Sequence, residues 1–210
     1  MPNKTRRRRT KLQPDFRLQY GRADIPKLSA QYLATVSKGR TAAEWDREME
    51  EAGGRIVNGE VARKNVETVY RWKSHRRMDL FVQNTDEEIA EELTNAIAAK
   101  TNPREAVESL TRLKGVGVKI ASAILTSMFP ELYTVCDFRA SEALGVDDRN
   151  DVDFYVAYLH ACRRIAKEYC VTLRNFDRAN WQWSKNRAKN KKSHDQSCDS
   201  RARRSNKFAA

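Results

Sequence analysis

A lysine and an aspartate flank a glycine-rich turn in the middle of this chain. Lys119 ends the stretch LKGVGVK of residues 113–119, and Asp137 ends the stretch YTVCD of residues 133–137. A lysine amine is a nucleophile when it is neutral, and a carboxylate stabilises positive charge that develops beside it. Glycines let backbone N–H groups approach a phosphate closely, above all where a helix begins. These residue types at this spacing indicate a nucleophile and a charged partner beside a nucleic-acid backbone.

Two helical segments are expected to position the turn. Asn102 before Pro103 has the character of an N-cap followed by a first helical residue, and apolar residues follow at helical spacing. After the glycines, a second helix is predicted over about 118–128. The sequence therefore predicts a helical hairpin within residues 105–128.

At these residues the chain resembles the helix-hairpin-helix DNA glycosylase superfamily, which includes endonuclease III and the 8-oxoguanine glycosylases. The family pattern is Leu-Pro-Gly-Val-Gly-x-Lys, followed by a Val-x-Asp or Val-Asp segment. The resemblance covers residues 105–146 and implies an all-α, helix-hairpin-helix glycosylase-like fold. Three residues depart from the pattern: Lys114 replaces the usual proline, Cys136 stands where valine and aspartate are usually contiguous, and Arg139 stands where many members carry histidine or asparagine.

The resemblance also implies catalytic roles for the lysine and the aspartate. In bifunctional members the matching lysine attacks the anomeric carbon of the sugar, displaces the base and forms a Schiff base that permits strand cleavage by β-elimination. Lys119 is therefore the expected nucleophile, and Asp137 is expected to stabilise the oxocarbenium-like sugar and to help activate the nucleophile. Each residue has an alternative role: Lys119 as a phosphate contact at a helix start, and Asp137 as the N-cap of a short helix that runs to Gly145.

A second set of residues is expected to contact the DNA backbone. Backbone N–H groups of the turn would hold a phosphate at the start of the second helix. The residues expected to bind DNA are Lys114, Gly115, Val116, Gly117, Val118, Arg139, Arg76 and Arg77. The resemblance implies a monovalent cation on the backbone carbonyls of Leu113 and Val116, whereas no side-chain metal site and no cofactor is expected. The alternative is an ordinary tight turn between two antiparallel helices.

The segment RWKSHRR of residues 71–77, followed by residues 81–84, is the predicted lesion-facing surface. It mixes cations with the planar ring of Trp72, as nucleic-acid surfaces do. Such a surface is needed because a base-excision enzyme extrudes its target nucleotide from the duplex into a pocket. The alternative is an exposed helix end with Trp72 in the core. Trp181 and Trp183 are expected to be packing residues.

Positive charge is concentrated at the two ends of the chain. The net charge of the 210 residues is +12; residues 1–11 hold six basic residues and no acid, and residues 184–210 hold nine basic residues and two acids. The part between them is close to neutral, so the positive net charge indicates polyanion-binding arms rather than a basic groove. Residues 1–20 are predicted to be a disordered basic arm, 21–186 a helical domain and 187–210 a disordered basic tail. Tails that merely aid solubility are the alternative.

The remaining pattern is helical almost throughout. Capping boxes at Thr41–Glu44 and Thr85–Glu88 each open a helix, and the first of these helices is predicted to end at Gly53-Gly54. Further helices are predicted over about 27–36, over 59–73, from Asp151 onward and over about 173–186. No alternating strand of useful length is found, so the predicted fold class is all-α.

Several classes of protein are disfavoured. No apolar run approaches the about 20 residues of a membrane span, and the arginine-rich start has no apolar segment behind it, as a secretory signal would. The four cysteines, at positions 136, 162, 170 and 198, form no C-x-x-C pair, which argues against a zinc ribbon or an iron–sulfur cluster. We therefore expect an intracellular monomer that acts on DNA and has no membrane partner.

Together these features predict a DNA base-excision repair glycosylase with associated AP lyase activity, acting on double-stranded DNA that contains a damaged base. An oxidised purine such as 8-oxoguanine is the favoured substrate, because a short chain without a cysteine cluster looks more like the 8-oxoguanine branch. Two alternatives stay open: a non-enzymatic helix-hairpin-helix DNA-binding protein, and a monofunctional glycosylase in which Asp137 activates water.

Overall fold

The computed structural model describes residues 14–205, with side chains described for residues 14–190, and this part of the chain is mostly helical. The prediction of an all-α protein is confirmed, apart from one very short pair of strands. The elements in chain order are η1 (Arg22–Asp24), α1 (Ile25–Leu33), β1 (Val36–Ser37), β2 (Arg40–Thr41), α2 (Ala42–Val57), α3 (Arg63–Lys73), α4 (Met78–Phe81), α5 (Asp86–Ala98), α6 (Pro103–Thr111), α7 (Val118–Met128), α8 (Phe138–Ala143), α9 (Val152–Glu168) and α10 (Leu173–Ser205).

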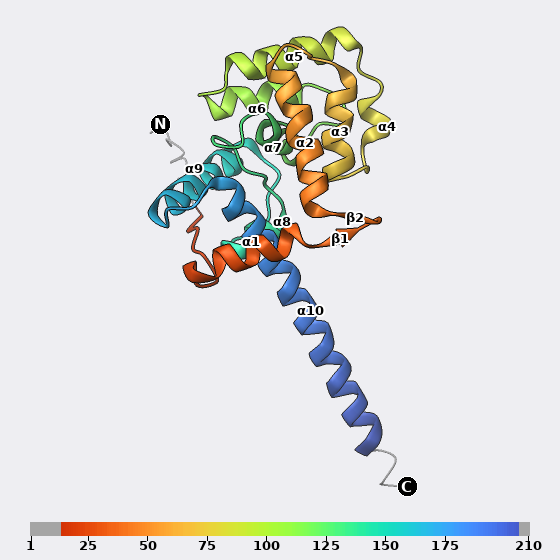
Figure 1. The fold of residues 1–210 in the computed structure, drawn as a ribbon, viewed down its shortest axis with the longest axis vertical. Coiled ribbons are helices and arrows are strands. Elements are labelled where there is room, and N and C mark those ends of the chain that lie inside the picture. The colour runs from red at the N-terminus through yellow and green to blue at the C-terminus, as the bar shows by residue number, and fades with distance from the viewer. Residues whose placement is uncertain (1–13, 206–210) are drawn as a thin grey trace, which may run out of the picture.

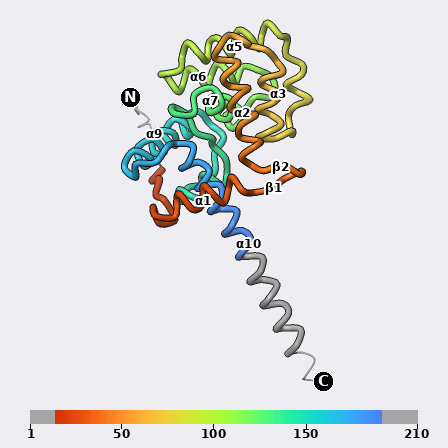
Figure 2. The backbone as a smooth tube through the Cα atoms, in the orientation of Figure 1, coloured from red at the N-terminus to blue at the C-terminus, as the bar shows by residue number. Residues whose placement is uncertain are grey.

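The helices form two groups, as Figure 1 shows. In one group α2 packs on α3 and α7, and α5 packs on α6. In the other, α10 packs on α1, α8 and α9. The tube in Figure 2 shows the red first helix beside the blue start of α10, so the first and last helices of the described chain pack in the same group. The segment 129–137 leads from α7 to α8 and therefore carries Asp137 from the first group toward the second.

Local capping signals correctly marked the starts of several helices. The capping boxes of Thr41 with Glu44 and of Thr85 with Glu88 are both complete, with the side chain of each residue bonded to the backbone N–H of the other. Asp151 accepts the N–H of Phe154 at 2.8 Å and so caps α9. These three predictions rest on short-range chemistry and are confirmed.

The predicted end of α2 at Gly53-Gly54 is wrong, because the helix continues to Val57. Gly53 is needed for packing instead: a Cβ at this position would overlap the backbone carbonyl of Ser127 in α7. Gly54 has open space around its Cα. The first glycine thus allows α2 and α7 to approach closely, which places α7 and its N-terminal turn against the rest of the group.

The predicted disordered arm of residues 1–20 is also too long. Phe16 is buried against the rings of Phe154 and Tyr158, and the N–H of Arg17 donates to the carbonyl of Leu144 at 2.9 Å. The predicted tail from residue 187 is likewise too long, because α10 continues as a helix to Ser205. The rest of both predicted tails, residues 1–13 and 206–210, lies outside the described residues.

Two helix boundaries shift for identifiable reasons. The helix predicted over 27–36 begins earlier, at the Pro26 turn, and stops at Leu33, because the chain then forms the β1–β2 hairpin. Lys38 and Gly39 both have positive φ and form the two-residue turn between the strands, as hairpin turns require. The helix predicted from 59 starts at Arg63, after Gly59 with φ +103°.

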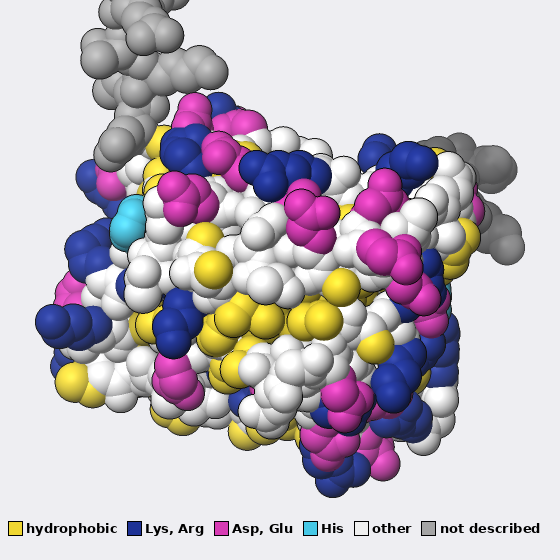
Figure 3. Space-filling view, turned by 90° about the horizontal axis from the view of Figure 1, so that it is seen from above, with side chains coloured by type: hydrophobic (Ala, Val, Ile, Leu, Met, Phe, Trp, Pro, Cys, Tyr) yellow, Lys and Arg dark blue, Asp and Glu magenta, His cyan; other side chains and the backbone are white. Residues whose placement is uncertain are grey.

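One face of the helical body carries mixed charge. On the face shown in Figure 3, Lys and Arg side chains alternate with Asp and Glu side chains around an apolar strip. Among the described residues, no helix combines the length and the apolar character needed to cross a bilayer.

Candidate active site

The glycine-rich turn joins α6 to α7 and is held against α4. Gly115 has φ +82°, and a Cβ there would lie 2.7 Å from the carbonyl oxygen of Arg77 and 2.8 Å from the backbone nitrogen of Phe81. Only glycine fits this position, for both conformational and steric reasons. Gly117 is the N-cap of α7 and offers no side-chain oxygen, so the first N–H groups of the helix remain available to an anion.

Asn84 anchors the turn from the side of α4. Its side-chain oxygen accepts the backbone N–H of Lys114 at 2.8 Å, and its amide nitrogen donates to the carbonyl oxygens of Lys114 at 3.0 Å and of Phe81 at 2.7 Å. Asn84 and Phe81 are both buried. The prediction that residues 81–84 face a DNA lesion is therefore wrong for these two side chains, which support the turn from behind.

Asp137 caps α8 and forms an ion pair at the same time. Its Oδ1 accepts the backbone N–H groups of Arg139 at 3.0 Å and Ala140 at 3.1 Å, as the N-cap interpretation predicts. Its Oδ2 accepts the amine of Lys73 at 2.6 Å. Burial by itself raises the pKa of the Asp137 carboxyl, but the Lys73 ammonium and the hydrogen bonds outweigh burial and hold that pKa below its usual range. Asp137 is therefore a carboxylate at neutral pH.

Lys119, the second residue of α7, has a different acidic partner. Its amine forms an ion pair with Asp148, which lies in the loop between α8 and α9, and about a third of its side chain (33%) is exposed. In this structure Lys119 and Asp137 are not paired with each other. The sequence pointed to neither Lys73 as the partner of Asp137 nor Asp148 as the partner of Lys119.

A cavity of about 540 Å³ nevertheless brings the expected residues together. It is lined by Lys73, Ser74, Arg76, Arg77, Gly115, Gly117, Lys119, Ile120, Asp137, Phe138, Asn150 and Trp181. The lysine amine, the aspartate and the turn thus border one space. The arginines of the predicted lesion-facing segment complete a positively charged rim.

The three residues that depart from the family pattern have distinct surroundings. Lys114 is exposed, with its backbone held by Asn84. Cys136 is fully buried, and burial raises the pKa of its thiol to about 12, so it is an inert packing residue. The guanidinium of Arg139 lies over the rings of Phe138 and Trp181, at 4.8 and 5.3 Å from their centroids. Arg139 therefore orders two aromatic side chains of the cavity wall.

The backbone of Leu113 and Val116, expected to hold a monovalent cation, lies within the turn. The carbonyl of Leu113 accepts the N–H of Val116 at 3.1 Å. Both side chains are buried and fasten the turn to the core. Among residues 14–190, no group of three or more His, Cys, Asp or Glu side chains is arranged to hold a metal ion.

A smaller cavity of about 190 Å³ lies next to the first and shares Lys73, Asp137 and Trp181 with it. Its remaining lining is Tyr32, Trp72, Val135, Asp177 and Arg178. Trp181, expected to be a packing residue, thus borders both cavities. Trp183 does pack, stacked on Tyr20 with ring centroids 5.7 Å apart.

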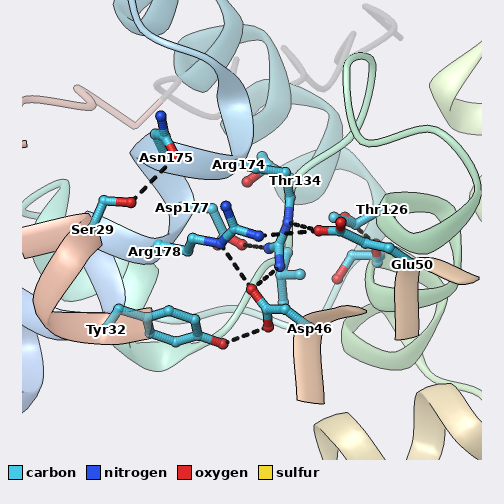
Figure 4. Close-up of polar contacts among 12 residues, drawn as sticks. Ser29, Tyr32, Asp46, Glu50, Thr126, Thr134, Arg174, Asn175, Asp177 and Arg178 are labelled. Carbon is cyan, nitrogen blue, oxygen red and sulfur yellow. Dashed lines mark hydrogen bonds and ion pairs between the residues drawn. The ribbon is translucent and has the colours of Figure 1, made fainter. Parts of the chain in front are cut away.

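A buried network of charges forms the floor beneath the smaller cavity, and Figure 4 shows its side chains converging on Asp46. Asp46 accepts hydrogen bonds from Arg174 at 2.6 Å and Arg178 at 2.8 Å through one oxygen. Its other oxygen accepts from Tyr32 at 3.0 Å and from the indole of Trp72 at 2.8 Å. Trp72 is therefore oriented by Asp46 and is neither a free surface ring nor a purely apolar core residue.

Asp177 extends this network to the cavity wall. It pairs with Arg174, which also binds Glu50 at 3.1 Å. Burial raises the pKa of Asp177 to about 6 against the attraction of the Arg174 guanidinium. The network joins α2 to α10 across more than a hundred residues of sequence, and no local motif marks it.

No protein-family model, curated protein or solved structure matches this chain.

Proposed function

We propose that this protein has a helix-hairpin-helix DNA glycosylase-like fold and is a base-excision glycosylase with associated AP lyase activity on double-stranded DNA. The observation that carries the proposal is the cavity of about 540 Å³, which is lined by Lys119, by Asp137 and by both glycines of the turn. A nucleophile, a carboxylate and a phosphate-binding backbone are the parts that this chemistry needs, and they share one space.

The roles follow from the chemistry of each group. Once neutral, the Lys119 amine attacks the anomeric carbon as the bond from that carbon to the base breaks, and the base leaves with the bonding electrons and takes up a proton. The Asp137 carboxylate stabilises the positive charge of the sugar in the transition state. Ring opening converts the adduct to a Schiff base, from which loss of a proton expels the 3′ phosphate. Lys119 has to leave Asp148 before it attacks.

DNA binding is supported by the backbone of the turn and by the charges around the cavity. The N–H groups of Gly115, Gly117 and Val118 lie at the start of α7, where the helix dipole favours an anion. Arg76 and Arg77 line the cavity beside them. The basic ends of the chain would add contacts that depend on phosphate charge and not on base sequence.

An oxidised purine such as 8-oxoguanine is the substrate that we propose first, because the sequence has no cysteine cluster and in this respect resembles the 8-oxoguanine branch. We further propose that the protein acts as a monomer inside the cell, with DNA. A second candidate function is a monofunctional glycosylase in which Asp137 activates water. One observation favours it: the amine of Lys119 is paired with Asp148 and not with Asp137, so the carboxylate that borders the cavity does not contact the amine it would have to activate.

Borohydride trapping on duplexes containing 8-oxoguanine and a panel of other damaged bases tests the proposal. The wild type and Lys64→Gln, a matched control at an exposed lysine of α3, should both form a covalent adduct, and Lys119→Gln should not. Base release without an adduct would favour attack by water. Neither adduct nor base release across the panel would leave a DNA-binding protein without catalysis and refute the proposal.

A further inference from the structure

Lys73 is a mostly buried cation at the end of α3. Its side chain is only 13% exposed, and its amine lies 2.6 Å from Oδ2 of Asp137. Lys73 lines both the larger and the smaller cavity. The sequence presents it as one of several surface cations in residues 71–77, whereas Arg76 and Arg77 in the same segment are exposed.

The other groups around Asp137 leave it without a second cationic partner among the described residues. Its Oδ1 is occupied by two backbone N–H groups of α8. On the side of α7, Lys119 is paired with Asp148. On the side of α10, Asp177 is a second acid, which Asp137 and Lys73 influence electrostatically. The neighbouring Cys136 thiol is buried and neutral at physiological pH.

Arg139 also contacts groups other than the Asp137 carboxylate. Its guanidinium lies over two aromatic rings of the cavity wall, and its Nη1 donates to the hydroxyl of Ser184 at 3.3 Å. Lys73 is therefore the side chain that compensates the Asp137 charge within the described part of the chain. It contacts the oxygen that the helix cap leaves free.

We propose that Lys73 is the positioning residue for Asp137: it keeps the carboxylate ionised and fixes its free oxygen at the wall shared by the two cavities. The catalytic consequence rests on the proposed function, because it assumes that Asp137 acts on a sugar. The effect on the charge of Asp137 does not, because it is a property of the free protein.

Asp177 illustrates what burial does to a carboxyl on the same cavity wall. Its arginine partner, Arg174, also binds Asp46 and Glu50. The pKa of Asp177 is raised to about 6. Among the described residues, Lys73 forms an ion pair with Asp137 alone, and the pKa of Asp137 is lowered. Without the Lys73 charge, the two backbone N–H groups of α8 would still favour the carboxylate, but burial and the nearby Asp177 would both favour the neutral acid.

Titration of the aspartate carboxyls by carbon-13 NMR in the free protein tests the effect on charge, with the Asp137 signal assigned by its loss in Asp137→Asn. Lys73→Met should raise the pKa of Asp137 by at least about 1. Lys73→Arg should restore the low value, and Lys64→Met, which removes an exposed lysine from the same helix, should leave it unchanged. An unaltered Asp137 titration in folded Lys73→Met would overturn the proposal. If that variant does not fold, Lys73→Gln provides the same comparison, since its amide can still donate to Asp137 without a charge.

The pH dependence of single-turnover base excision tests the catalytic consequence. Excision requires ionised Asp137, so the rate falls as the pH drops through the pKa of Asp137. The acid limb should therefore move to higher pH in Lys73→Met and return in Lys73→Arg. If the wild type excises no base, the proposed function fails, and the NMR titration still decides the effect on charge. If the wild type excises but neither the titration nor the acid limb moves, the role of Lys73 is refuted.

Discussion

The substitution Asp137→Asn separates the roles that the structure gives to this residue. Asparagine caps a helix about as well as aspartate, so the two hydrogen bonds from Arg139 and Ala140 should be kept. The ion pair with Lys73 is lost, and the Lys73 ammonium, 13% exposed, is left without its ion-pair partner. The stability of the variant is therefore decided by the ion pair more than by the cap.

The magnitude follows from the burial of the pair. Removing one partner of a fully buried ion pair costs about 3–5 kcal/mol, because the other charge stays desolvated. Lys73 and Asp137 remain 13% and 17% exposed and border a cavity that admits water, which reduces the cost. We expect a loss of about 2–3 kcal/mol at neutral pH, or a fall in Tm of roughly 4–12 °C for a protein of this size. The cap alone, which is all that the sequence reveals, would predict about 1 kcal/mol or less.

The loss should depend on pH in a defined direction. The pKa of Asp137 is lower in the folded protein than its ordinary value. Its contribution to stability is therefore fully present above the pKa of the unfolded chain, about 3.9, and is lost as the pH falls through the lower pKa of the folded state. The difference between wild type and Asp137→Asn should be largest near neutrality and should shrink as the pH falls below about 4.

Urea unfolding of both proteins at pH 7 and at pH 3 measures the stability difference, and single-turnover kinetics measure excision. The double variant Lys73→Met with Asp137→Asn is the control, because it removes both charges and should recover part of the lost stability. Excision should fall at least about 100-fold, as after removal of one preorganised electrostatic group. A stability loss below about 0.5 kcal/mol, or one that does not change with pH, would refute the reasoning about the ion pair. Near-normal excision by the folded variant would reduce Asp137 to a helix cap.

Three further predictions test other parts of the molecule. Gly53→Ala should destabilise the protein by about 3 kcal/mol in urea unfolding, because the new Cβ would overlap the backbone of α7. The control Gly54→Ala, whose Cβ would lie in open space, should stabilise the protein by up to about 1 kcal/mol. Equal effects of the two substitutions would refute the close contact between α2 and α7. Asp148→Asn should speed borohydride trapping by up to about 5-fold, because Lys119 no longer has to leave an ion pair worth roughly 1 kcal/mol before it attacks, and an unchanged or slower rate would refute this inhibitory role of the pair. Deleting residues 1–11, which hold six basic residues, should reduce the slope of log affinity for duplex DNA against log salt by up to about 5, and an unchanged slope would assign the phosphate contacts to the helical body.

Much of the local architecture could be predicted from the sequence. Asn102, Asp137 and Asp151 are N-caps as expected, and α7 has the predicted bounds of Val118–Met128. These features depend on interactions between residues three or four positions apart, so they can be predicted from the sequence alone. The position of the glycine turn between two helices follows in the same way, so the outline of the candidate site was accessible without coordinates.

The roles of the two glycine pairs show where this reasoning stops. In the turn, Gly115 needs positive φ, which sequence patterns do suggest, but its contact with the backbone at Arg77 was not foreseeable. In α2, Gly53-Gly54 has the composition of a helix end, yet the helix passes through it. A glycine used for close approach of two helices looks the same in sequence as a glycine used to end one, because the difference lies in the partner helix.

The electrostatics of the site were decided by the tertiary structure. Which lysine neutralises Asp137 depends on how α3 and α8 are placed, and the fold chooses Lys73 from a segment of several cations. Asp148 and Asp46 acquire their partners from elements far away in the chain. Ion pairing depends on distance and burial, and both are set by packing between helices rather than by spacing along the chain. The residues of the proposed chemistry could therefore be identified from the sequence, whereas the charged partners that control them are determined by the tertiary structure.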